Sequence, residues 1–175
     1  MNEFLSEENI LLHRDYLRNK RLKYSILEDS VSSLKGADVR DVLRMRLNQY
    51  DRRDALSLLP EIKLHELFFS SFTSARFPHS DLVCDGWGNE AAFLNEIFRV
   101  GMTLGCGFVC IYFSGALITV RGFGNYLDAF KFGEPLLALD VFEHAYFMDY
   151  GFDKERYLIS ALPYLDITKI TDADI

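Results

Sequence analysis

The sequence places two ionisable side chains, Asp140 and His144, four residues apart inside a run of apolar and aromatic residues. The run extends from Asp140 to Gly151 and reads Asp-Val-Phe-Glu-His-Ala-Tyr-Phe-Met-Asp-Tyr-Gly. Burying a carboxylate or an imidazole is costly unless each group has a partner. A fold that buries this run must therefore supply partners for both residues. One divalent or trivalent metal ion would satisfy them together, although the two side chains could instead hydrogen-bond across one helical turn.

This run closely resembles the signature of the iron/manganese superoxide dismutases, Asp-x-(Trp/Phe)-Glu-His-Ala-Tyr followed closely by Asp-Tyr-Gly. In that family the aspartate and the histidine are two of four metal ligands, so the resemblance implies this role for Asp140 and His144. The resemblance covers nearly the whole chain, most securely the part beyond His65. It implies one iron or manganese ion per chain, superoxide as the substrate, and dioxygen and hydrogen peroxide as the products.

The other two ligands that the resemblance implies are His65 and His13. The segment Leu-His-Glu-Leu-Phe-Phe, which contains His65, is similar to the family's His-x-(Leu/Tyr)-(Phe/Tyr)-(Trp/Phe) on its second long helix. His13 follows Ser6 by seven residues, the interval between a capping residue and a ligand histidine on the family's first helix. The remaining histidine, His79, has no family counterpart, and we interpret it as a solvated loop histidine.

A second register of the first helix is open. The segment that starts His13-Arg-Asp-Tyr16 also resembles the later part of the family's first helix, where a tyrosine guards the substrate channel. In that register Tyr16 is the channel tyrosine and Glu8 falls at the ligand position. In the first register His13 is the ligand and Arg21 takes the place of the tyrosine, so the two registers exclude each other. We favour His13, because it keeps three histidines with one aspartate and lets Ser6 cap the helix.

Charge and composition exclude several other classes of protein. The formal net charge is −7, and the basic cluster over 14–23 alternates with apolar residues, which argues against a nucleic-acid partner. No apolar run reaches the roughly 18 residues of a membrane span, and residues 1–9 are polar and acidic, unlike a signal sequence. We therefore expect a cytoplasmic protein without membrane contact. The odd, sparse set of cysteines predicts buried free thiols rather than a disulfide framework or a zinc site; they are Cys84, Cys106 and Cys110.

Hydrophobic periodicity predicts helices first and strands later. Helical spacing extends over 6–27 and 39–50, and a further helix should carry His65, beginning near Ala55 or, with Pro60 in an early turn, near Leu59. The later predicted elements are a helix over 89–103, strands over 108–113, 116–120 and 136–140, and closing helices over 143–150 and 153–162.

The expected fold class is therefore α+β. An N-terminal antiparallel helical hairpin domain should occupy residues 1–78, and a C-terminal α/β domain with a three-stranded antiparallel sheet should occupy residues 79–175. The metal site should lie between the two. This order of elements matches the all-helical first half and the α/β second half of the family that the sequence resembles.

The residues expected around the metal depart from the family pattern. Phe108 and Cys110 stand where the family's Gly-x-Gly-Trp-x-Trp run has two tryptophans, and Phe142 replaces another. The family's glutamine or histidine that hydrogen-bonds the metal's solvent has no clear counterpart here, and Asn125 is the nearest candidate. Because such residues tune the redox potential of the metal, metal binding is better supported than fast dismutation.

Glu143 is retained, and in the family this residue bridges to the ligand histidine of the opposite subunit. The resemblance therefore implies a homodimer joined near Glu143 and His144. Three functions remain open: an iron or manganese superoxide dismutase, a metalloenzyme of the same fold that acts on an organic substrate with dioxygen, and a non-catalytic structural homologue. The register that makes Glu8 a ligand would favour the second. For a dismutase, the expected catalytic residues are Tyr16, Asn125 and Glu143.

Overall fold

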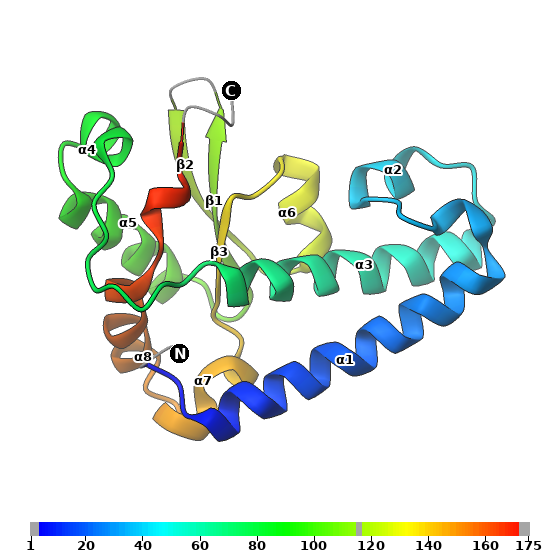
Figure 1. The fold of residues 1–175 in the computed structure, drawn as a ribbon, viewed down its shortest axis with the longest axis horizontal. Coiled ribbons are helices and arrows are strands. Elements are labelled where there is room, and N and C mark those ends of the chain that lie inside the picture. Colours follow the sequence, from blue (N-terminus) through cyan, green and yellow to red (C-terminus); the bar gives the residue numbers. More distant parts are fainter. Residues whose placement is uncertain (1–3, 115–116, 172–175) are drawn as a thin grey trace.

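The computed structural model describes residues 4–114 and 117–171. Its first half is an antiparallel pair of long helices, α1 (Glu7–Ser30) and α3 (Gln49–Ser70), as Figure 1 shows. They are connected by the 3-10 turn η1 (Ser32–Leu34) and the short helix α2 (Val39–Arg44). The side chain of Ser6 caps α1 by accepting a hydrogen bond from the backbone N–H of Asn9 at 3.2 Å. The predicted helical hairpin and the predicted cap are confirmed.

Helix α3 begins earlier than the sequence predicts. Asn48 caps it by accepting hydrogen bonds from the backbone N–H groups of Tyr50 and Asp51, both at 3.0 Å. The helix predicted over 39–50 is therefore divided between α2 and the first residues of α3. Pro60 lies in the interior of α3 rather than in an early turn. A proline there removes one backbone hydrogen bond, and the helix persists because packing against α1, β3 (Leu137–Asp140) and α6 (Tyr126–Phe132) holds it.

The second half contains a three-stranded antiparallel sheet with the order β2-β1-β3. The strands are β1 (Phe108–Ser114), β2 (Leu117–Phe123) and β3 (Leu137–Asp140). In this register Phe108 pairs with Phe123 on one side and with Asp140 on the other. The α+β fold class and the antiparallel sheet are confirmed. Ala116, the predicted start of the second strand, lies outside the described residues.

Helices cover both faces of the sheet. Figure 1 shows α4 (Asp81–Trp87) and α5 (Glu90–Thr103) to one side, with α3 and α6 (Tyr126–Phe132) to the other. After β3 the chain forms α7 (Glu143–Tyr150), α8 (Lys154–Ala161) and the 3-10 turns η2 (Leu162–Tyr164) and η3 (Ile167–Lys169). Neither α4 nor α6 was predicted from the sequence. Both helices are short, and their main signal is a capping side chain, Ser80 for α4 and Asn125 for α6.

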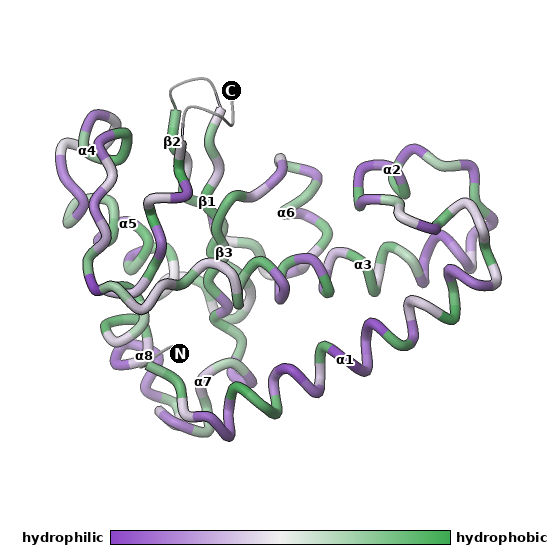
Figure 2. The backbone as a smooth tube through the Cα atoms, in the orientation of Figure 1, coloured by the Kyte–Doolittle hydropathy of each residue, from purple (hydrophilic) through white to green (hydrophobic). Residues whose placement is uncertain are grey.

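The buried hydrophobic residues form one continuous cluster that includes residues from both halves. Figure 2 shows hydrophobic residues concentrated around the sheet, whereas hydrophilic residues recur along α1. Strands β1 and β3 are buried on both faces, which explains their nearly uninterrupted apolar sequence. The division of the chain after residue 78 stays a prediction. Among the described residues, no helix has both the length and the apolar composition to cross a bilayer.

Candidate metal centre

The four residues predicted as metal ligands converge where four elements meet. His13 comes from α1, His65 from α3, Asp140 from the end of β3, and His144 from the first turn of α7. One potential ligand atom from each residue lies within 4.8 Å of the other three. His13, His65 and Asp140 are buried, whereas 38% of the His144 side chain is exposed. The fold therefore brings together residues that are far apart in the sequence and leaves one edge of the cluster open. These four residues form the ligand cluster.

The distances between these atoms fit a single ion. Oδ2 of Asp140 lies 3.1 Å from Nε2 of His144 and 3.5 Å from Nε2 of both His13 and His65. The Nε2 atoms of His65 and His144 are 3.2 Å apart. Two ligand atoms that each lie about 2.1 Å from a metal are about 3.0 Å apart at 90° and about 3.6 Å apart at 120°. All four separations fall in this interval.

Hydrogen bonds outside the cluster orient two of these side chains. Oδ1 of Asp140 accepts a hydrogen bond from the backbone N–H of Phe142 at 2.9 Å, which directs Oδ2 toward the imidazoles. Nδ1 of His65 lies 2.7 Å from the carbonyl oxygen of Glu61. A carbonyl oxygen can only accept, so Nδ1 carries the proton and the lone pair of Nε2 faces the cluster. Metal-binding histidines are commonly held in this way.

The cluster also contains polar atoms without partners. In the described part of the chain, both ring nitrogens of His13 and Oδ2 of Asp140 are buried and have no hydrogen-bond partner. Buried polar atoms of this kind are rare, because leaving water without a replacement contact is costly. An ion between Nε2 of His13 and Oδ2 of Asp140 would satisfy both atoms. Three imidazoles with one carboxylate form a donor set that suits iron or manganese.

The electrostatics of the cluster are dominated by burial and by the Asp140 carboxylate. Burial lowers the pKa of His65, which favours the neutral imidazole that binds metals. Burial disfavours ionisation of Asp140, but its contacts with His13 and His144 hold the pKa of this carboxyl below its usual range. Burial likewise disfavours protonated His144, yet the nearby Asp140 carboxylate raises the pKa of His144. Protons and a metal ion therefore compete for His144.

A second group of polar side chains lies directly beside the ligand cluster, and its central residue is Glu61. Glu61 is buried on α3, one turn before His65. Its carboxylate accepts hydrogen bonds from the Tyr16 hydroxyl and, at 2.8 Å, from Nζ of Lys20. The centroid of the Tyr16 ring lies 5.7 Å from that of His65 and 5.5 Å from that of His144. We call Tyr16, Lys20 and Glu61 the Glu61 triad.

Glu61 was not predicted as a site residue. The available signal was a carboxylate within the apolar stretch Leu-Leu-Pro-Glu-Ile, four residues before His65 and therefore on the same face of a helix. The structure places both His13 and Tyr16 at the site, His13 in the ligand cluster and Tyr16 beside it. Glu8 is exposed and outside the cluster. Nη2 of Arg21 pairs with Glu66 on α3 at 2.8 Å.

The other predicted catalytic residues take different positions. Asn125 is exposed and caps α6, accepting a hydrogen bond from the backbone N–H of Asp128 at 3.0 Å. Its neighbour Tyr126 reaches the site, with its ring centroid 5.8 Å from that of His65. Burial, assisted by the charge of Glu61, raises the pKa of Tyr126. Glu143 is exposed at the start of α7, adjacent in sequence to His144.

Aromatic rings line the sides of the ligand cluster. Phe69 lies 5.0 Å from His13 and Phe108 lies 5.3 Å from His65, both between ring centroids. Phe142 stacks on His144 with centroids 5.5 Å apart. Such rings limit the entry of water and strengthen electrostatic interactions inside the site.

The cysteines depart in part from the expectation that all are buried. All three are free thiols, but only Cys110 is buried. Cys106 is exposed because it lies in the bend before β1 rather than within the strand, and Cys84 on α4 is half-buried.

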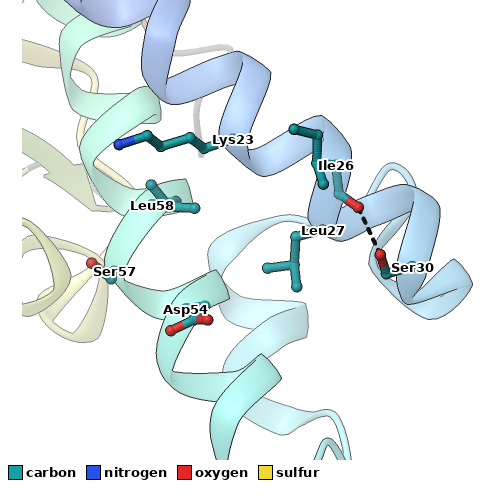
Figure 3. Close-up of a pocket in the computed structure, with 7 residues that line it drawn as sticks. All are labelled: Lys23, Ile26, Leu27, Ser30, Asp54, Ser57 and Leu58. Atoms are coloured by element: carbon teal, nitrogen blue, oxygen red, sulfur yellow. Dashed lines mark hydrogen bonds between the residues drawn. The ribbon is translucent and has the colours of Figure 1, made fainter.

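A separate open pocket of about 420 Å³ lies between α1 and α3 (Figure 3). Its lining includes Lys23 and Leu27 from α1 and Leu58 from α3, which lie between the two helices in the close-up. The hydroxyl of Ser30 donates to the carbonyl oxygen of Ile26 at 2.9 Å, so it already has a partner. No member of the ligand cluster lines this pocket. The pocket is therefore distinct from the candidate metal centre.

Comparison with known proteins gives one family match. Residues 79–172 match the family model described as iron/manganese superoxide dismutases, C-terminal domain. The matched segment is more than half of the chain, and it contains Asp140 and His144. A comparison with curated proteins gives no match.

Proposed function

The chain belongs to the iron/manganese superoxide dismutase family, and on this premise we propose that it converts superoxide to dioxygen and hydrogen peroxide. Its proposed cofactor is one iron or manganese ion per chain. The observation that carries the proposal is the convergence of three imidazoles and one carboxylate at separations that suit a single ion. The proposed ligands are His13, His65, Asp140 and His144.

A bound iron or manganese ion would supply reversible one-electron chemistry. The chain must then attract an anionic substrate and deliver two protons for each hydrogen peroxide. Lys20 provides positive charge beside the site, because its Nζ lies 5.0 Å from the centroid of the Tyr16 ring. This cation offsets the carboxylates locally in a chain whose overall charge is negative.

The Glu61 triad supports a route for protons from the solvent. The Lys20 side chain is 25% exposed, and its Nζ donates to the Glu61 carboxylate, which also accepts from the Tyr16 hydroxyl. In the proposed route, a proton from the Lys20 side converts the Glu61 carboxylate to the carboxylic acid. This acid donates its proton to the Tyr16 oxygen as Tyr16 gives its own hydroxyl proton to the substrate. Tyr16 thus keeps its proposed catalytic role, with Glu61 as a residue that positions its hydroxyl.

We further propose that the active form is a homodimer. The exposed rings of Phe147 and Phe152 lie with centroids 5.0 Å apart, at 47% and 84% exposure. Phe147 follows His144 by three residues on α7, so these two side chains lie on one face of that helix. A second copy would cover these rings, and burial of apolar surface would stabilise the pair. Glu143 would then lie near the partner's cluster. A cytoplasmic location is supported by the three free thiols, which persist in reducing compartments.

The deciding experiment measures the superoxide dismutation rate per bound ion in a sample whose iron and manganese contents are determined. A rate of about 10⁷ M⁻¹s⁻¹ or more, approaching the diffusional limit of about 10⁸ to 10⁹ M⁻¹s⁻¹, would support the proposal. A negligible rate in metal-loaded protein would contradict it and favour the oxidation of an organic substrate with dioxygen. Protein that takes up no metal and is equally stable without it would instead indicate a structural homologue.

A further inference from the structure

Three side chains with metal-binding atoms also meet outside the ligand cluster. His79 lies in the loop after α3, Cys84 lies on α4, and Glu90 is the first residue of α5. One ligand atom from each, a nitrogen, a sulfur and an oxygen, lies within 4.8 Å of the other two. We propose that these residues form a second metal site, which takes a divalent cation of the zinc class.

His79 has a carboxylate at each ring nitrogen. Its Nε2 lies 2.9 Å from Oδ1 of Asp81, and its Nδ1 contacts Oε1 of Glu90. An ionised carboxylate only accepts, so each ring nitrogen donates a proton to its carboxylate. An ion that binds Nδ1 would displace the proton there, while Nε2 keeps its proton and donates it to Asp81. A carboxylate behind the ligand histidine is the usual support of zinc-binding imidazoles.

The ligand chemistry selects the class of ion. Thiolate, imidazole and carboxylate together suit zinc, whereas the ligand cluster proposed for iron or manganese contains only nitrogen and oxygen donors. Binding an ion would release the thiol proton of Cys84, and its thiolate and the carboxylate of Glu90 would then match the two charges of a divalent cation. Three protein ligands leave a fourth position for water in a tetrahedral site.

The position of the site indicates what the ion would do. His79 and Glu90 also line an apolar pocket of about 320 Å³, whose other walls include Leu162, Leu165 and Ile167 from the end of the chain. An ion would therefore fasten the loop that leaves α3 to the first turn of α5 and to α4. We expect it to stabilise the connection between the helical hairpin and the sheet, independently of chemistry at the ligand cluster.

Cobalt(II) is the probe that separates the two sites. The ligand cluster contains no sulfur, so a sulfur-to-cobalt charge-transfer band in the near-ultraviolet reports only a site with a cysteine. The protein is first loaded with manganese and then titrated with cobalt. The expected result is a band that saturates at one cobalt per chain and disappears when zinc is added. Absence of the band would overturn the proposal, whatever the dismutation rate.

Variants of the cysteines identify the residue that supplies the sulfur. The band should be lost in Cys84→Ser and retained in Cys106→Ser, which removes the exposed cysteine outside the cluster. The opposite pattern would overturn the proposal. Asp81→Asn tests the outer carboxylate, and we expect it to keep the band but to weaken zinc affinity about tenfold, near the lower end of such effects because Asp81 is exposed.

Discussion

The carbonyl oxygen of Glu61 accepts a hydrogen bond from Nδ1 of His65 at 2.7 Å, while the carboxylate of the same residue binds the side chains of Tyr16 and Lys20. One residue of α3 thus orients a proposed metal ligand through its backbone and organises the neighbouring polar side chains through its carboxylate. Because a helical turn fixes the distance between Glu61 and His65, the ligand cluster and the Glu61 triad keep a fixed position relative to each other.

Replacing Glu61 with glutamine should lower activity more than metal content. The substitution leaves the backbone bond to His65 but removes the charge that Lys20 neutralises. We expect the dismutation rate per bound ion to fall at least tenfold, and the free energy of unfolding to decrease by about 1–3 kcal/mol, because a buried charged hydrogen bond is lost. Stopped-flow assay, metal analysis and urea denaturation measure the three quantities.

Glu66→Gln is the matched control for this variant. Glu66 lies on the same helix and pairs with Arg21 of α1 at 2.8 Å, but this pair is partly exposed. Its loss should change stability by less than about 0.5 kcal/mol and leave the rate per ion unchanged. Equal effects of the two substitutions would argue that charge in general, rather than the position of Glu61, matters.

Removing the Tyr16 hydroxyl tests the proposed proton donor. Tyr16→Phe keeps the ring that lies against His65 and His144 but removes the bond to Glu61. Positioned proton transfer contributes about 10² or more to many reactions, so we expect a fall of about 10²-fold in kcat with unchanged metal content. The exposed Tyr50 provides the control as Tyr50→Phe. An unchanged kcat in Tyr16→Phe would remove Tyr16 from the mechanism.

Asp140→Asn should prevent retention of iron and manganese. The buried carboxylate is the only charged oxygen donor of the ligand cluster, and Oδ2 lies within 3.5 Å of Nε2 in all three histidines. We expect the bound metal to fall below about a tenth of the wild-type content, measured by elemental analysis after dialysis. The exposed aspartate Asp29 gives the control Asp29→Asn, which should retain the metal. Full retention by Asp140→Asn would contradict the proposed ligand set.

A charge introduced at Phe147 should separate the proposed dimer. The Phe147 ring is exposed and packs against that of Phe152, so Phe147→Glu should leave the fold of one chain intact. Light scattering should then report one chain per particle instead of two. Leu117→Glu changes an exposed apolar residue on β2 and should remain dimeric. Monomeric wild-type protein would exclude the dimer.

The cysteines should differ in their reaction with iodoacetamide. Burial raises the pKa of the Cys110 thiol to about 12, so only about one molecule in ten thousand carries the reactive thiolate at pH 8. Cys106 is exposed and should be labelled within minutes, whereas Cys110 should stay unmodified until the protein unfolds. Mass spectrometry of the digested protein identifies the labelled residues. Rapid labelling of Cys110 would show that β1 opens readily in solution.

The sequence predicted the fold where the pattern was long or repeated. The periodicity of α1 and α5 and the nearly uninterrupted apolar sequences of β1 and β3 arise directly from which faces are buried. The start of α3 was predicted too late, because Pro60 was expected in an early turn and Asn48 was not recognised as the helix cap. The interior proline is accommodated by tertiary packing, which a local pattern does not contain.

In the candidate sites, too, local sequence motifs were predictive and contacts made by tertiary packing were not. The sequence motif brought the four members of the ligand cluster into consideration, but it offered no reason to connect Glu61 with Tyr16 and Lys20, which come from a different helix. The contact of His79 with Glu90 likewise depends on the path of the loop and on α4, a helix that was not predicted. Contacts between separate elements are set by packing, and short motifs do not encode them.

The ligand cluster joins a residue of the first helix to one of the seventh, with its other members from α3 and β3. An ion held there would act as a cross-link that closes most of the chain into loops, and unfolding of any of the four elements would require its release. The occupied protein would then resist proteases far longer than the empty one. The supply of metal in the cell would thereby set the lifetime and the abundance of this protein as well as its activity.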